Sequence, residues 1–178
     1  LARFANVSFS DGSLLHGFNQ RFAKRQPISA PNDVLRYFMT PQEAGELCLL
    51  SGLLGENRDI FFPANDKNFD LISFSDLAKR YVKNLGFEPY ECATEEEARK
   101  EGSKLIETKR WPCYFFVSDT TGEKPFEEFY TSKEFLDMDK FKNIGVIKND
   151  SFQETKKLDF FLDRVEKIRN SSKWTKGE

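Results

Sequence analysis

The sequence predicts an α/β fold in a single compact unit, and three observations lead to this class. Short apolar runs typical of strands alternate along the chain with segments whose apolar residues recur at helical spacing. Sequence patterns that cap helices precede several of the helical segments. No internal repeat, low-complexity tract or long linker interrupts the alternation.

The chain opens on a predicted strand at residues 2–9, in which apolar and small polar residues mix. The turn Asp11-Gly12-Ser13 then ends the strand, and a helix is predicted at 13–24. A strand, a glycine turn and a helix N-terminus are typical of α/β proteins, where the loop after a strand's carboxyl end commonly holds a ligand. A polar connection with an extended piece at 27–30 leads to a short strand at 35–39.

A well-marked helix is predicted at 40–55. Thr40 is its N-cap, Pro41 occupies the first helical position, and Glu43 completes a capping box. Gly55 ends the helix. We expect one buried stripe on this helix, made of Ala44, Leu47, Cys48, Leu50 and Leu54.

The remaining elements follow the same logic. A polar loop is expected at 119–131, and the C-terminal segment forms an amphipathic helix of about five turns. Its cap is Ser151 with Glu154, and its stripe is Leu158, Phe161, Val165 and Ile168. Between the helix at 40–55 and the loop at 119–131 we expect strand 58–63, helix 75–86 capped by Ser75, strand 87–93, helix 94–107 capped by Thr94 and Glu97, and strand 112–118.

Composition excludes several classes of function. The chain has 178 residues and a formal net charge of −2, so no basic field draws it to nucleic acid or an anionic membrane. No run is long and apolar enough to span a membrane, and the first residues carry no signal-peptide pattern. The cysteines, interpreted as buried apolar thiols in a reducing compartment, favour a cytoplasmic protein. The three cysteines and the single histidine, His16, fit no metal site, and we expect the thiols to be buried. His16 is either a wall residue of a ligand site or an ordinary helical histidine.

Three loops carry polar groups that look placed for binding. The first joins Asn6, at a strand end, to a helix start at 10–13 whose free N–H groups suit an anion. In the second, Arg36 either clamps a phosphate in bidentate fashion or forms an ordinary surface salt bridge. The third, 120–124, reads by itself as a turn. No glycine-rich phosphate loop occurs, so catalysis by this chain alone has little support.

Taken together, the three loops resemble the C-terminal part of an extended short-chain dehydrogenase/reductase of the polysaccharide-biosynthesis (CapD-like) type. The closest resemblance is to the UDP-N-acetylglucosamine 4,6-dehydratase and nucleotide-sugar epimerase group. The family's R-[YF]-x-N-V strand with its Gly-Ser turn stands here as "RFANVSFSDGSLL". Its substrate-binding segment stands as "QPISAPNDVLRYFMTPQEAGEL", and its "RPGEKLHEE" as "TTGEKPFEEF". Thr120 replaces the arginine of that last motif, and Lys124 and Arg110 are candidates to take over its role.

The resemblance implies a small mixed α/β domain plus a late strand of a Rossmann sheet. Residues 1–25 would end the Rossmann-type region, 26–150 would form the substrate domain, and 151–178 the C-terminal helix. The N-terminal NAD(P)-binding domain, with the catalytic residues, would lie outside this sequence, and 87–119 fits no common family pattern. Val7 would lie near the nicotinamide, and the implied substrate-binding residues are Asn6, Ser13, Pro27, Ile28, Ser29, Arg36, Glu123 and Lys124.

The function implied is sugar-nucleotide binding within an NAD(P)-dependent 4,6-dehydratase acting on UDP-N-acetylglucosamine or a similar UDP-sugar. NAD or NADP would take hydride from C4, water would leave from C6, and hydride would return there. Two alternatives remain: a 4-epimerase of the same superfamily, and a non-catalytic module that docks a protein through its C-terminal helix. Since the opening strand would expose an apolar edge, we also expect self-association or a homo-oligomer.

Overall fold

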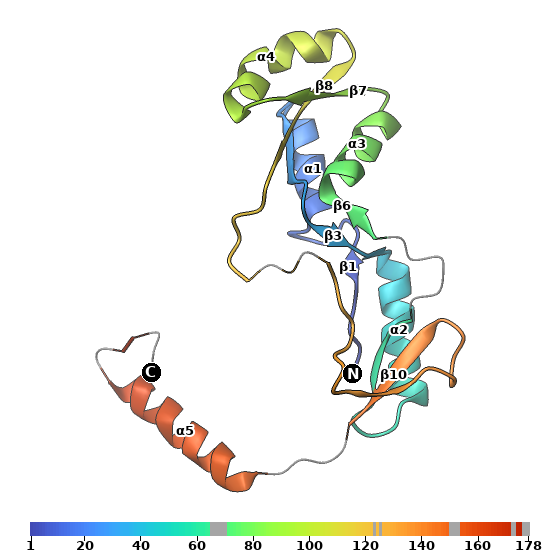
Figure 1. Cartoon of the computed structure of the whole chain (residues 1–178), viewed down its shortest axis with the longest axis vertical. Helices are drawn as coiled ribbons and strands as arrows, with labels where there is room; N and C mark the ends of the chain where they lie inside the picture. Colours follow the sequence, from blue (N-terminus) through green and yellow to red (C-terminus); the bar gives the residue numbers. More distant parts are fainter. Residues whose placement is uncertain (65–70, 123, 125, 150–153, 172–173, 176–178) are drawn as a thin grey trace.

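The computed structural model describes residues 1–64, 71–122, 124, 126–149, 154–171 and 174–175. Helices and strands alternate along these residues, which confirms the predicted α/β class. Figure 1 shows α1, α3 and α4 around β7 and β8 in the upper part, and α2 beside β10 in the lower part. In chain order the elements are β1 (Asn6–Val7), α1 (Leu14–Ala23), β2 (Ile28–Pro31), β3 (Leu35–Arg36), β4 (Phe38–Met39), α2 (Pro41–Leu54), β5 (Ile60–Pro63), β6 (Ile72–Ser73), α3 (Phe74–Asn84), β7 (Glu88–Cys92), α4 (Glu95–Glu107), β8 (Arg110–Phe116), β9 (Phe135–Asp137), β10 (Ile144–Lys148) and α5 (Thr155–Asn170).

The upper part is built on a parallel sheet of order β2-β8-β7. Helices α1 and α3 pack on one face, where Trp111 and Cys113 of the central strand β8 are buried. Helix α4 covers the other face and packs Ala98 and Leu105 against Cys92. The segment 87–119 is therefore a βαβ unit that completes this sheet.

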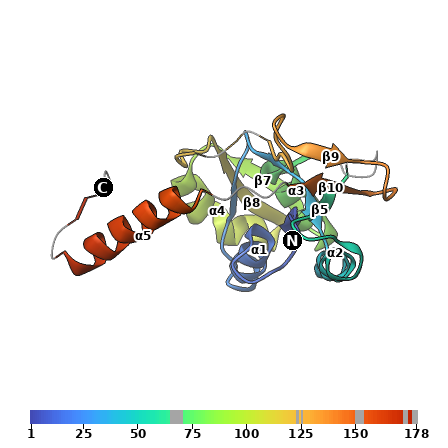
Figure 2. The ribbon, with the colours of Figure 1, turned by 90° about the horizontal axis from the view of Figure 1, so that it is seen from below.

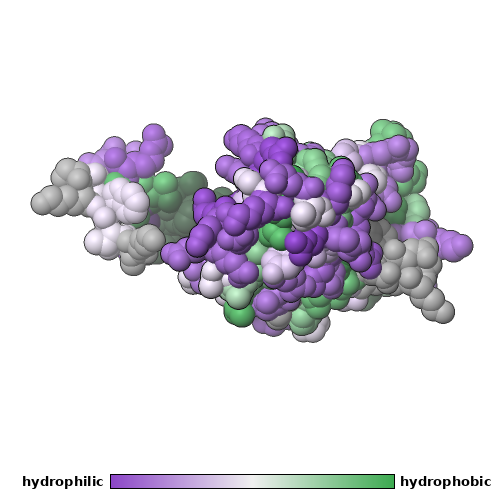
Figure 3. All heavy atoms as spheres, turned by 90° about the horizontal axis from the view of Figure 1, so that it is seen from above, coloured by the Kyte–Doolittle hydropathy of each residue, from purple (hydrophilic) through white to green (hydrophobic). Residues whose placement is uncertain are grey.

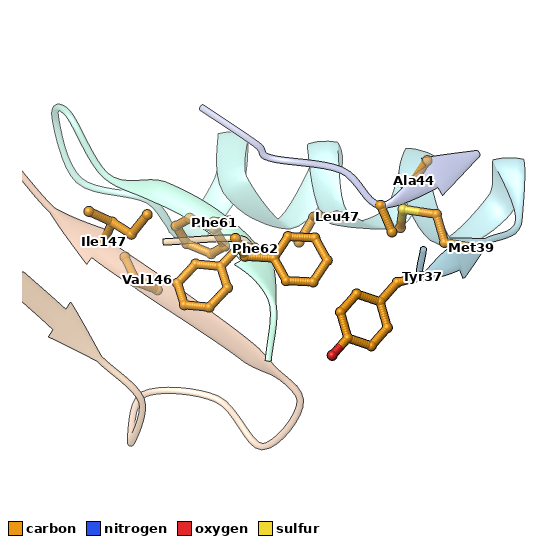
Figure 4. Packing of buried hydrophobic residues seen from close by; sticks show 10 residues of the cluster. Tyr37, Met39, Ala44, Leu47, Phe61, Phe62, Val146 and Ile147 are labelled. Carbon is orange, nitrogen blue, oxygen red and sulfur yellow. The ribbon is translucent and has the colours of Figure 1, made fainter. Parts of the chain in front are cut away.

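The lower part is an antiparallel sheet of order β5-β10-β9. Ala2 forms a parallel bridge to Phe61 of β5, so the first residues add a strand-like edge to this sheet. Figure 4 shows the core between this sheet and α2, where Phe61 and Phe62 lie against Val146. Gly145 lies under the Phe62 ring, and a Cβ at that position would come within 2.2 Å of a ring carbon. Larger side chains are therefore excluded there.

Local capping signals were largely accurate. The capping box of Thr40 and Glu43 is present in α2, and Thr94 caps α4 as expected. Helix α3 begins earlier than predicted, because Ser73 rather than Ser75 accepts the N-cap hydrogen bond. For α5 the expected cap was Ser151 with Glu154. Ser151 lies outside the described residues, and the Glu154 side chain makes no cap hydrogen bond.

The predicted buried stripe of α2 was wrong in part. In α2 only Ala44 and Leu47 are buried, while Cys48 and Leu54 are exposed, because the helix meets β5 along a narrow strip. In α5 the predicted amphipathic helix is present, and none of its apolar stripe is buried. The pattern in each case identified an apolar face correctly but not whether another element covers it.

The three thiols should differ sharply in reactivity. Cys48 is exposed, whereas Cys92 and Cys113 are buried, and burial together with the Cys92 thiol raises the pKa of Cys113 to about 12. Because the thiolate is the reactive form, we expect one fast-reacting thiol per native chain with Ellman's reagent and three after denaturation. The variant Cys48→Ser should lose the fast phase, and two or more fast thiols in the native chain would contradict the structure.

Candidate functional site

The three loops singled out in the sequence meet at the carboxylate of Glu127. Asn6 donates from Nδ2 to Glu127 Oε2 at 2.7 Å. Arg36 Nε lies 3.9 Å from the same oxygen. Residues separated by up to 121 positions in sequence thus contact one carboxylate, Asn6 by a hydrogen bond and Arg36 by an ion pair. The opening strand, the β3–β4 strands and the 120s loop form one surface.

The Arg36 guanidinium is held in a fixed orientation. Its Nη1 donates to the backbone oxygens of Leu35 at 2.8 Å and Lys124 at 2.9 Å. The guanidinium carbon lies 6.0 Å from the centre of the Phe74 ring, at the outer limit of a cation–π contact. With 13% of the side chain exposed, Arg36 presents an edge to solvent without the freedom of a surface arginine.

The Asn6 amide is also fixed by the backbone around it. Its N–H donates to Tyr37 O at 3.0 Å, within the parallel pairing of β1 and β4, and its Nδ2 donates to the same oxygen at 3.2 Å. The next residue, Val7, pairs with Met39 in that register. The sequence Asn-Val therefore places an amide and an apolar side chain at the carboxyl end of a short parallel strand.

A cleft of about 290 Å³, here called the strand-end cleft, opens beside these residues and is lined by Asn6, Val7 and Ser13 together with Phe38 and Phe74. Ser13 is the N-cap of α1, and its hydroxyl accepts from the His16 N–H at 3.2 Å. The turn before it needs a positive φ of 76° at Gly12. The cleft thus joins a strand end to a helix N-terminus, as the sequence suggested.

A second cleft, of about 440 Å³, is called the Arg36 cleft and is lined by Arg36, Thr120, Lys124 and Glu127. Lys124 Nζ lies 2.7 Å from Glu128 in an exposed ion pair. The Asn6–Glu127 hydrogen bond links this cleft to the strand-end cleft, since Asn6 lines the one and Glu127 the other. Lys124 lies in the Arg36 cleft with Thr120, whereas Arg110 is not among the residues that line it.

The remaining predicted residues are placed differently. Pro27 and Ser29 line a separate cleft of about 370 Å³ between α1 and α4. Ile28 is fully buried in the core and does not line this cleft. Glu123 lies outside the described residues.

Sequence reasoning missed Glu127, which the structure makes the common partner of two loops. The residue stood in the quoted "TTGEKPFEEF" stretch, but its chemistry gave no signal, because a glutamate in a polar loop is usually a solvated surface residue. Only the pairing of β1 with β4 brings Asn6 and Arg36 close enough to share it.

The segment after Glu127 is clamped to the opening strand. Arg3 Nη1 donates to Phe129 O at 2.8 Å, and its Nη2 lies 2.6 Å from Glu134 Oε1. The hydrogen bonds from Arg3, with a further one from the Thr131 N–H, lower the pKa of Glu134 to about 2. This clamp fixes the segment that follows Glu127 in the chain.

A pH test follows from that clamp. A carboxyl whose pKa falls on folding stabilises the fold fully above its ordinary pKa, near 4.5, and the contribution is lost as the pH falls toward 2. Arg3→Ala should therefore lower the urea midpoint at pH 7 and make the decline between pH 4.5 and 2 shallower. Lys133→Ala, on an exposed neighbour, serves as the control. Parallel pH profiles for Arg3→Ala and the wild type would rule the clamp out.

The described part of the chain holds neither a metal-binding cluster nor a helix that could span a membrane. No group of three or more His, Cys, Asp and Glu side chains is placed there to hold a metal ion. Among the same residues no helix has the length and apolar character needed to cross a membrane.

Comparisons with known proteins agree with the polysaccharide-biosynthesis resemblance. The probable polysaccharide biosynthesis protein EpsC of Bacillus subtilis (strain 168) is 30% identical over 106 residues, which are 59% of this chain and 17% of that protein. The capsular polysaccharide biosynthesis protein CapD of Staphylococcus aureus matches to the same extent. This chain thus spans about a sixth of the length of these relatives.

A solved structure supports the fold. The X-ray structure of Pen from Bacillus thuringiensis matches 91% of this chain and 48% of its own, with a TM-score of 0.57 and 17% sequence identity. The family profile described as "Polysaccharide biosynthesis protein" matches residues 1–149, which contain β1 through β10 and both linked clefts. The chain therefore belongs to the polysaccharide biosynthesis protein family.

Proposed function

We propose that this chain binds the sugar nucleotide of an NAD(P)-dependent nucleotide-sugar 4,6-dehydratase, with UDP-N-acetylglucosamine or a similar UDP-sugar as substrate. The observation that carries the proposal is the shared Glu127 carboxylate, which draws Asn6 and Arg36 into one continuous surface. Membership of a polysaccharide biosynthesis family supports the substrate class, because such pathways consume activated sugars.

The diphosphate would bind in the Arg36 cleft. Arg36 is already oriented, so little conformational entropy is lost when it donates to a phosphate. The Lys124 ammonium forms an exposed ion pair with Glu128, worth less than about 1 kcal/mol, and can turn to a phosphate at small cost. Lys124 would thus supply the cation that Thr120 does not.

The sugar and the nicotinamide end of the cofactor would meet in the strand-end cleft. Its volume of about 290 Å³ lies just below the usual range for ligand pockets, about 300–1,000 Å³, so it suits the nicotinamide ring with a sugar beside it rather than a whole dinucleotide. NAD(P), when bound, would supply hydride transfer. Val7 would present an apolar wall to that ring, and the Asn6 amide would orient the sugar next to it.

Binding is the property to measure first. Titration calorimetry of the chain with UDP-N-acetylglucosamine and with UDP should give similar weak binding, while N-acetylglucosamine alone should give none. Lys124→Ala should weaken binding by about tenfold, since a hydrogen bond to a charged group contributes about 1.5–3 kcal/mol and part of it is screened at an exposed site.

A matched control is Lys100→Ala, which removes an exposed cation from α4. Equal loss of affinity in Lys100→Ala and Lys124→Ala would show a general charge effect and count against the Arg36 cleft. Dehydratase turnover by the 178-residue chain alone would contradict the division of labour proposed here.

A further inference from the structure

Helix α5 presents a broad apolar face that no element of the described chain covers. Figures 1 and 2 show α5 lying apart from the rest of the chain. Figure 3 shows hydrophobic atoms on this part of the chain, at the left of the view. It lies beyond residue 149, where the family match ends. The face is formed by Leu158, Phe161, Leu162 and Val165, which are 55%, 60%, 53% and 36% exposed, with Ile168 partly buried.

Helix α2 carries a second uncovered apolar face, opposite the strip that packs on β5. Leu49 and Leu53, one turn apart, are 61% and 70% exposed. Gly45 and Gly52 lie on the same side, and a Cβ added to either would meet no atom within 4 Å. A glycine inside a helix costs about 1 kcal/mol relative to alanine. Two of them beside exposed leucines give a surface onto which another helix can pack closely.

The charges on the two faces are complementary. Between Tyr37 and Asn57 the sequence has no lysine or arginine, and Glu43 and Glu46 lie in the first half of α2. On α5, Arg164 and Arg169 lie beside the apolar face in the second half of the helix. An antiparallel arrangement places these arginines near the two glutamates and also opposes the helix dipoles.

Pairing of α5 with another α5 is less favourable. Leu158, Phe161, Val165 and Ile168 occupy the a and d positions of two heptads, which puts Lys157 and Arg164 at g and Arg169 at e. A parallel pair would set Arg164 against Arg169 of the other helix, and an antiparallel pair would set Lys157 against Arg164. In both orientations basic side chains oppose each other.

We propose that α5 of one copy packs antiparallel on the outer face of α2 of a second copy, and reciprocally. The structure keeps α5 away from its own α2 while both faces are open. When two copies exchange their α5 helices, each α5 covers the α2 of the other copy, so all four apolar faces are buried in one symmetric dimer.

Sedimentation analysis of the full chain over a concentration series should show a dimer. Phe161→Glu and Leu49→Glu should each lower the association constant at least about 100-fold, because burial of such a side chain corresponds to about tenfold or more and the contact occurs twice. Phe160→Glu is the matched control, since Phe160 is 65% exposed on the other side of α5 and should leave the dimer unchanged.

Mixing the two defective variants separates this arrangement from its rivals. A Leu49→Glu copy retains a sound α5 and a Phe161→Glu copy a sound α2, so the mixture should form a heterodimer tighter than either homodimer. Gly52→Gln, which favours the helix but fills the gap, should also weaken the dimer while the melting temperature holds or rises. A monomeric wild type, a dimer that survives Leu49→Glu, or a mixture that forms no heterodimer would overturn the proposal.

Discussion

Replacement of Arg36 by alanine is expected to lower the affinity for a UDP-sugar by about 10- to 150-fold. The guanidinium is nearly buried, already oriented by two backbone oxygens, and lies in the cleft proposed for the diphosphate. Hydrogen bonds to a charged group contribute about 1.5–3 kcal/mol, and each 1.4 kcal/mol is a factor of ten in affinity. Titration calorimetry at fixed ionic strength measures the change.

One further variant and a stability measurement keep this result interpretable. Arg36→Lys retains the charge but not the planar fork, so its affinity should fall between those of the wild type and Arg36→Ala. Melting temperatures of all variants should be compared, because Arg36 also holds Lys124 O. Unchanged affinity in a folded Arg36→Ala protein would remove the Arg36 cleft from the proposed site.

Replacement of Trp111 by alanine is expected to lower the free energy of unfolding by about 3–5 kcal/mol. The indole is 2% exposed on the central strand β8, stacks on Phe22 at 4.2 Å between ring centres, and meets Phe87 edge-on at 5.0 Å. Its Nε1 also donates to Gln26 O at 3.2 Å, which would lose this partner. Urea denaturation measures the loss, and the melting temperature should fall by roughly 6–20 °C.

The other tryptophan provides the control. Trp174 is 65% exposed after the end of α5, so Trp174→Ala should change the stability by no more than about 0.5 kcal/mol. An equal effect of the two substitutions, or a loss below about 1 kcal/mol in Trp111→Ala, would contradict the packing between β8 and α1.

The α/β class and most helices could be predicted from the sequence because their signals are local. Thr40 with Glu43 and Thr94 with Glu97 are close enough in sequence to satisfy the first turn of a helix without any other part of the fold. Alternating apolar runs then identified the strands β5, β7 and β8.

The β9–β10 hairpin and the second face of α2 could not be predicted in this way. The hairpin is stabilised by cross-strand pairing of β10 with β5, about eighty residues earlier. On α2, Leu47 and Leu49 look alike in the sequence, yet Leu47 is buried and Leu49 is exposed. Burial depends on which face of the helix another element covers, and the sequence pattern does not show this.

The candidate site was predictable in its parts but not in its assembly. The resemblance named Asn6 and Arg36, and the structure brings them to one carboxylate. The resemblance gave no indication of Glu127. It also grouped Pro27 and Ser29 with Asn6 and Arg36, whereas in the structure Pro27 and Ser29 line a different cleft. Sequence order carries little information on which loops of a fold share a surface.

The most direct test of the central claim is an NMR titration of the isotope-labelled chain with UDP-N-acetylglucosamine. If the two linked clefts hold the ligand, backbone amide shifts should cluster at residues 6–13, 36–39 and 120–128 and disappear in Arg36→Ala. Shifts confined to other surfaces, or no shifts at saturating ligand, would contradict it.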